Sequence, residues 1–157
     1  MKFEEFSQKD ILQLFNLITK EMDQMFFLVD HAYRIQYINR AFGEYVKKDI
    51  SEIIDKEFGE ALGCGNIFTD QKNCAFTSYC KTCEIRKNLH QVFDGLTHKV
   101  EFDMVREFKI LDEVVVRHLS FKLVPIVLHS ERFALCLVDD KRNDDEMAMM
   151  INPNASI

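Results

Sequence analysis

The chain has 157 residues, of which 47% are hydrophobic and 29% charged, with only five Gly and two Pro. This composition predicts one folded globular domain with short extensions and excludes a disordered or fibrous protein. Its net charge of −6 disfavours binding to nucleic acid or to an anionic membrane surface. No apolar run approaches the ~20 residues of a membrane span. Because the charged stretch Met1 to Asp10 also differs from a signal peptide, we expect a cytoplasmic protein.

The N-terminal segment is expected to form an amphipathic helix over residues 8–23. Ser7 and Asp10 have the spacing of a capping box, and apolar residues then recur at helical intervals, namely Ile11, Leu14, Phe15, Ile18 and Met22. Leu12 and Leu17 make this apolar stripe wider than one packing face needs. The stripe packs either on the chain's own core or on a partner, and we expect a homodimer through this helix.

Two strands and short helices are expected next. An apolar run and a period-two alternation predict the strands, and Asn39 is suited to cap the helix that follows. We expect Gly59, Gly63 and Gly65 to begin an irregular segment. The predicted strands are residues 25–29 and 34–38, and the predicted short helices are residues 41–46 and 50–58.

A longer helix and three antiparallel strands are expected in the second half. Ile85, Leu89 and Val92 mark an amphipathic helix that begins at Cys83 and ends at Asp94-Gly95. Pro125 falls late in the middle strand, where a missing donor is tolerated at an edge or an end. The strands are expected around residues 100–104, 119–123 and 133–138, with turns near 111–113 and 129–131.

These elements predict an α+β fold with a single antiparallel five-stranded sheet, helices on one face and the N-terminal amphipathic helix before it. Each strand has only one consistently apolar side, so one covered face is the economical packing. The expected organisation is an N-terminal helical cap (1–23), one domain (24–142) and a flexible acidic and Met-rich tail (143–157).

The cysteines are the most informative feature of the sequence. Four of the five have the spacing Cys64-x9-Cys74-x5-Cys80-x2-Cys83, and we call residues 64–83 the cysteine segment. Four thiolates suit zinc or an iron–sulfur cluster, and the C-x-x-C pair can direct both sulfurs at one ion. Two alternatives stay open, namely free or redox-paired thiols with a dithiol switch at Cys80 and Cys83, and simple packing. Cys136, on an apolar strand face, is expected to be a packing residue.

The order of elements resembles that of a PAS domain from about Asp23 to Arg142. The resemblance rests on Val29-Asp30 before a break, on Ile38-Asn39-Arg40-Ala41-Phe42 at the start of a helix, and on the acidic strand exit at residues 137–142. The segments around the cysteines, residues 59–64, Cys74 and residues 78–86, resemble a cysteine-bearing subgroup of bacterial sensory proteins.

This resemblance implies a non-enzymatic sensory module, dimeric through its N-terminal helix, that passes its signal to a downstream signalling protein. Cys64, Cys74, Cys80 and Cys83 are then the expected cofactor and metal ligands, for an iron–sulfur cluster or zinc that senses redox state or oxygen. The alternatives are a zinc-stabilised protein-interaction or dimerisation module and a thiol-based redox switch. No catalytic triad order, phosphate-binding glycine loop or paired-carboxylate motif supports an enzyme.

Overall fold

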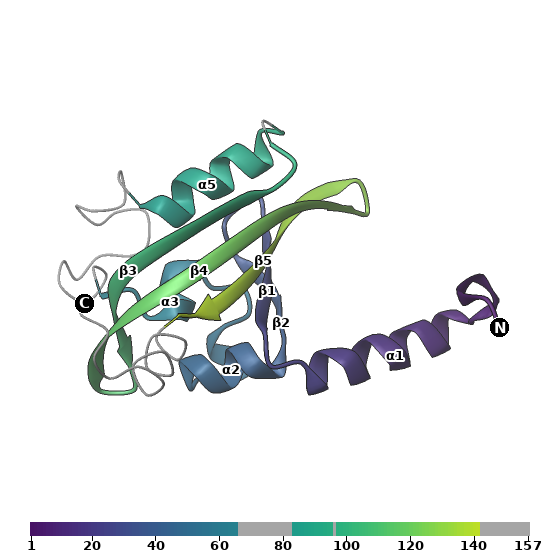
Figure 1. Ribbon diagram of the computed structural model, residues 1–157, viewed down its shortest axis with the longest axis horizontal. Helices are drawn as coiled ribbons and strands as arrows, with labels where there is room; N and C mark the ends of the chain where they lie inside the picture. The colour runs from purple at the N-terminus through teal and green to yellow at the C-terminus, as the bar shows by residue number, and fades with distance from the viewer. Residues whose placement is uncertain (66–82, 96, 142–157) are drawn as a thin grey trace, which may run out of the picture.

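The computed structural model describes residues 1–65, 83–95 and 97–141, and its centre is a five-stranded antiparallel sheet (Figure 1). The strand order is β2-β1-β5-β4-β3, so β2 and β3 are the edge strands. The strands are β1 (Met25–Asp30), β2 (Ile35–Ile38), β3 (Val100–Ile110), β4 (Glu113–Leu128) and β5 (Glu131–Asp140). The helices are α1 (Gln8–Glu21), α2 (Arg40–Val46), α3 (Phe58–Leu62) and α5 (Glu84–Phe93), with 3-10 turns at Phe3–Glu5 and Ile50–Glu52. The predicted fold class is confirmed.

Three helices cover one face of the sheet, which we call the inner face. Their buried side chains include Phe42 of α2, Phe58 of α3 and Leu89 of α5. These meet the inward residues of every second strand position, such as Phe27 and Phe121, in a single core. The residues that alternate with them face away from the helices.

The segment between α2 and α3 differs from the predicted helix over residues 50–58. Only Ile50–Glu52 forms a 3-10 turn, and the chain reverses at Asp55, which has φ 65°. The backbone N–H of Asp55 donates to the carbonyl of Ile35, and that of Ile35 donates to the carbonyl of Lys56. The prediction was wrong because these long-range bonds to β2 compete with helical ones. Gly59 also lies inside α3 rather than in an irregular segment.

The expected position of Pro125 is confirmed. β4 is a central strand, but its pairing with β3 reaches only to Leu123, opposite Val100. From Pro125 onward β4 therefore pairs with β5 alone.

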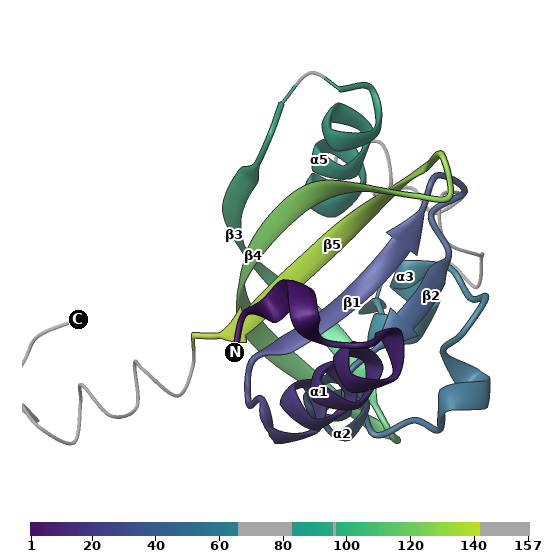
Figure 2. The ribbon, with the colours of Figure 1, turned by 90° about the vertical axis from the view of Figure 1, so that its right-hand side faces the viewer.

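Helix α1 extends away from the sheet, and only its C-terminal half, from Phe15 onward, meets the rest of the domain (Figures 1 and 2). Its capping box is formed by Ser7 and Asp10, as predicted. Thr19 is its one buried residue. Six large apolar side chains are exposed by 38–60%, namely Ile11, Leu12, Leu14, Phe15, Leu17 and Ile18. The chain's own core therefore leaves the apolar stripe uncovered. No helix in the described ranges is long and apolar enough to cross a bilayer.

Candidate functional site

Cys64 is placed against the edge strand β3 by the two glycines that flank it. Gly63 ends α3 with φ 79°, and its carbonyl accepts the Lys109 N–H at 2.7 Å. Cys64 then forms an isolated β-bridge with Phe108. A Cβ at Gly63 would lie 2.3 Å from the Lys109 main-chain oxygen, and one at Gly65 would lie 2.8 Å from the Glu107 oxygen. Only glycines allow this close approach, so they fix where Cys64 lies.

Cys83 occupies the N-cap position of α5 and is 7% exposed. Its carbonyl accepts the first helical hydrogen bond, from the Lys87 N–H at 3.0 Å. The sulfur is packed into the edge of the core rather than used as a cap. Cys83 is thus fixed by a helix terminus, whereas Cys64 is fixed by a strand edge.

Arg106 connects these two cysteines. It lies on the inner face of β3, between Met104 and Phe108, and is half-buried. Its Nη1 donates to the Cys83 sulfur at 3.5 Å, and the guanidinium also has a hydrogen-bonding contact with Cys64. Burial lowers the pKa of Arg106, but the contacts with Cys83 and then Cys64 outweigh it, so that the pKa is raised. The two ends of the cysteine segment therefore meet at one cation.

The other cysteines divide into two groups. Cys74 and Cys80 lie outside the described residues, so their place in a four-ligand site stays a prediction. Among the residues that the structure describes, no three metal-ligating side chains are grouped closely enough to hold an ion. Cys136 is fully buried in β5, as predicted, and burial raises the pKa of its thiol. It lies two strands away from β3.

Aromatic rings hold the first turn of α5 in place. The Arg86 guanidinium lies 4.7 Å from the Tyr33 ring centroid and 5.3 Å from that of Phe58. Tyr33 also meets Phe93 edge-on, at a centroid distance of 5.6 Å. These contacts join both ends of α5 to the β1–β2 turn and to α3, which stabilises the helix that begins at Cys83.

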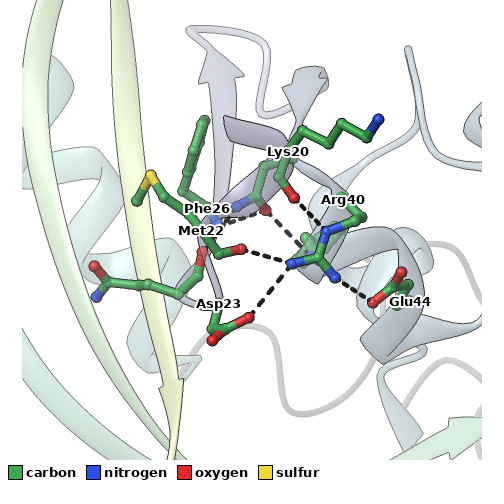
Figure 3. A network of polar contacts seen from close by, with 9 residues as sticks. Lys20, Met22, Asp23, Phe26, Arg40 and Glu44 are labelled. Carbon is green, nitrogen blue, oxygen red and sulfur yellow. Dashed lines mark hydrogen bonds and ion pairs between the residues drawn. The ribbon is translucent and has the colours of Figure 1, made fainter. Parts of the chain in front are cut away.

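A second polar cluster joins α1 to the domain, and we call it the Arg40 junction (Figure 3). Arg40, the first residue of α2, donates to the carbonyls of Lys20 and Met22 at the end of α1. The same guanidinium pairs with Asp23 at 3.4 Å and with Glu44 at 2.7 Å. These carbonyls have no partners within their own helix. Arg40 therefore supplies the hydrogen-bond donors that the end of α1 lacks, and it fixes the direction in which α1 leaves the domain.

Asn39 lies beside Arg40 and is 2% exposed. Its side-chain oxygen accepts the N–H of Phe42, as predicted for a cap, at 3.1 Å. The same oxygen accepts the N–H of Phe26, and the side-chain amide donates to the Gln24 carbonyl at 2.8 Å. One buried amide therefore fixes the start of α2 to the start of β1.

Sequence reasoning missed two functional candidates, Arg106 and Arg40. A signal for Arg106 was available, because the alternation of Phe102 and Met104 places residue 106 on the apolar face, where arginine is unexpected. Arg40 has no comparable signal. Its partners at Lys20 and Met22 are main-chain carbonyls, which the sequence does not display.

The sequence matches no protein-family model and no curated protein. The fold, however, is similar to solved PAS domains. That of a two-component sensor histidine kinase aligns over 86% of this chain and 100% of its own, with a TM-score of 0.60 and 8% identity. The PAS domain of an HTR-like protein from Haloarcula marismortui aligns over 84% of this chain and 98% of its own, with a TM-score of 0.58 and 14% identity. The PAS domain of Bordetella pertussis BvgS aligns over 94% of this chain and 99% of its own, with a TM-score of 0.56 and 13% identity. At these identities the similarity establishes a PAS fold.

Proposed function

We propose that this chain is a non-enzymatic PAS sensory module of the cysteine-bearing type, and that Cys64, Cys74, Cys80 and Cys83 bind an iron–sulfur cluster or zinc. The signal it senses is redox state or oxygen, and its output is a change in contacts with a downstream signalling protein. Support for a sensory role comes from the PAS fold, because one of the similar solved PAS domains belongs to a two-component sensor histidine kinase.

The observation that supports a metal site is that Cys64 and Cys83 both contact the guanidinium of Arg106. These residues are 19 positions apart in the sequence, at opposite ends of the cysteine segment. A segment whose ends already meet loses less conformational entropy when an ion joins its thiolates. The donor set of four thiolates matches a tetrahedral ion or a cubane cluster.

Anaerobic purification with metal analysis and a visible spectrum tests this function. A brown protein that contains iron and acid-labile sulfide supports a cluster, and a colourless protein with one zinc supports a structural ion. A protein that contains no metal would contradict the proposed site and favour the thiol switch at Cys80 and Cys83. Single Cys→Ser variants at the four positions should each lower metal content, whereas Cys136→Ser should not.

We also propose that two copies of the chain pair through α1. The supporting observation is the uncovered apolar stripe, because six exposed large apolar residues on one helix are costly in water unless a partner covers them. A second copy offers the same stripe, and two amphipathic helices can bury each other's apolar sides.

Light scattering on a variant with Leu14→Glu and Ile18→Glu tests this pairing, and we expect the mass to fall from dimer to monomer. The matched control is Gln13→Glu with Asn16→Glu, which adds the same charge at exposed polar positions of α1. If the folded Leu14/Ile18 variant keeps the parent's mass, α1 is not the interface.

A further inference from the structure

The chain enters and leaves the sheet at the same end. β1 and β5 are antiparallel neighbours, and Met25, the first residue of β1, pairs with Val138 near the end of β5. Residues 22–24 alone separate α1 from β1, so α1 ends close to the point at which β5 ends (Figure 1). Both of these points contact the same short helix, α2.

The first turn of α2 holds the end of α1 through the Arg40 junction (Figure 3). The Arg40 guanidinium donates to the carbonyl of Lys20 and, at 3.1 Å, to that of Met22. Glu44, one turn further along α2, pairs with the same guanidinium. Because these bonds connect α2 to main-chain groups of α1, a shift of α2 moves the end of α1 with it.

The last turn of α2 holds the end of β5. The Tyr45 hydroxyl donates to the Asp140 carboxylate at 2.8 Å, and the Arg117 guanidinium of β4 lies 5.9 Å from the Tyr45 ring centroid. Burial and then the bond to Asp140 raise the pKa of Tyr45, so its hydroxyl keeps its proton and stays a donor. Strand pairing ends one residue later, where the Lys141 N–H donates to the His118 carbonyl at 2.8 Å.

Between these two contacts, one side of α2 is packed in the core and another borders a cavity. Phe42 is fully buried, and its ring centroid lies 4.9 Å from that of Phe27 on β1. The cavity measures about 680 Å³ and is lined by α2, with Arg40 and Tyr45, and by the end of β5, with Val138. A rigid helix in this position has room to move with the core, and both of its polar contacts move with it.

We propose that α2 is a rigid connector between the two ends of the domain: when α2 is displaced, its hold on α1 and its hold on the end of β5 change together. This inference goes beyond the proposed metal site and does not depend on it. Its consequence for pairing rests on the proposed role of α1. A change in the core would then alter the contacts of α1 and the exit of the chain from β5 at once.

Amide hydrogen exchange on the full chain, measured by NMR, tests this coupling. The Met22 N–H, bonded to the Ile18 carbonyl at 2.9 Å, reports the end of α1, and the Lys141 N–H reports the end of β5. Tyr45→Phe removes one bond to a carboxylate and should speed exchange at Lys141 roughly 3–10-fold. It should also speed exchange at Met22 by about 2-fold or more, and Arg40→Gln should act in the opposite direction, because coupling is reciprocal. If Arg40→Gln fails to fold, Arg40→Lys, which loses the planar fork, tests the same contact.

Tyr37→Phe is the matched control, because it also removes one tyrosine hydroxyl but leaves the polar contacts of α2 in place. The Tyr37 hydroxyl, on β2, donates to the Thr19 hydroxyl of α1 at 3.3 Å. This variant should speed exchange at Met22 and leave Lys141 at the parent's rate.

A second control removes the direct link between the two ends. Gln24, just before β1, donates from its side-chain amide to the Asp139 carboxylate at 3.3 Å. In a Gln24→Ala background, Arg40→Gln should still speed exchange at Lys141, because the proposed connection runs through α2.

The outcomes decide the role of α2 separately from the metal site. Exchange that changes only at the end nearest to each substitution would overturn the inference. Equal changes at Lys141 in Tyr37→Phe and Arg40→Gln would also overturn it, as would loss of the distant effect in the Gln24→Ala background. Metal analysis of the same samples keeps the two proposals apart, since a parent without metal contradicts the cysteine site while the exchange rates still decide the role of α2.

Discussion

Replacing Gly63 by Ala should destabilise the protein at the point where Cys64 meets the sheet. Gly63 has φ 79°, a left-handed conformation that costs other residues about 1–2 kcal/mol. The new Cβ would also lie 2.3 Å from the Lys109 oxygen, so β3 would have to move. That movement weakens the 2.7 Å bond from the Lys109 N–H to the Gly63 carbonyl, worth about 0.5–1.5 kcal/mol. We expect a total loss of about 2–3 kcal/mol, or roughly 4–12 °C in melting temperature.

Gly43→Ala is the matched control within the same chain. Gly43 lies inside α2 at negative φ, and a Cβ there would meet only the Ile38 Cδ1 at 3.5 Å, an ordinary contact. Alanine in a helix interior should stabilise by about 0.5–1 kcal/mol. Urea denaturation followed by circular dichroism measures both variants. If Gly63→Ala unfolds at the parent's midpoint, or if both variants shift alike, the close approach to β3 does not fix the cysteine.

Three further predictions concern other parts of the fold. Asn39→Ala should lower the free energy of unfolding by about 2–4 kcal/mol, because it removes a helix cap and leaves buried main-chain groups unpaired. The control Asn88→Ala removes only a bond to the Glu84 carbonyl of the same helix and should change the free energy of unfolding by less than about 0.5 kcal/mol, so equal effects in urea titrations would contradict this. Cys136→Ala should cost roughly 1 kcal/mol and leave metal content unchanged, and metal loss would overturn its role in packing. Hydrogen bonds from Ser7 lower the pKa of Asp10 in the folded chain. The Asp10 carboxylate therefore stabilises α1 fully above the pKa it has in the unfolded chain, about 4, and this stabilisation is lost as the pH falls through its lower pKa in the folded chain. An NMR titration in which the Asp10 carboxyl shows an unshifted or raised pKa would contradict that contribution.

The strands and long helices were predictable because their signals are local. The capping box of Ser7 and Asp10 lies within four residues, and the alternation in β3, β4 and β5 lies within each strand. Asn39 shows the limit of this reasoning. Its cap to Phe42 was predictable, but its bonds to Phe26 and Gln24 cross 13 and 15 residues. The helix expected at 50–58 was wrong for the same reason, because bonds to Ile35 outweigh local propensity.

The candidate site was predictable only in part, and the part that was missed is informative. The spacing of the cysteines indicates a ligand set but cannot show which cation faces it, because Arg106 follows Cys83 by 23 residues and belongs to another element. What the sequence does contain is a conflict: a strand whose alternation places apolar side chains inward has an arginine at one of those inward positions. Such conflicts persist where something else in the structure compensates for them, and they are more common at functional sites. Here Arg106 donates to the sulfur of Cys83, and this ties the unfavourable position on β3 to one end of the cysteine segment. A leucine would pack at this inward position of β3 without the cost of burying a charge, so we expect Arg106→Leu to raise the melting temperature of the metal-free chain, and a lower melting temperature would contradict this reasoning.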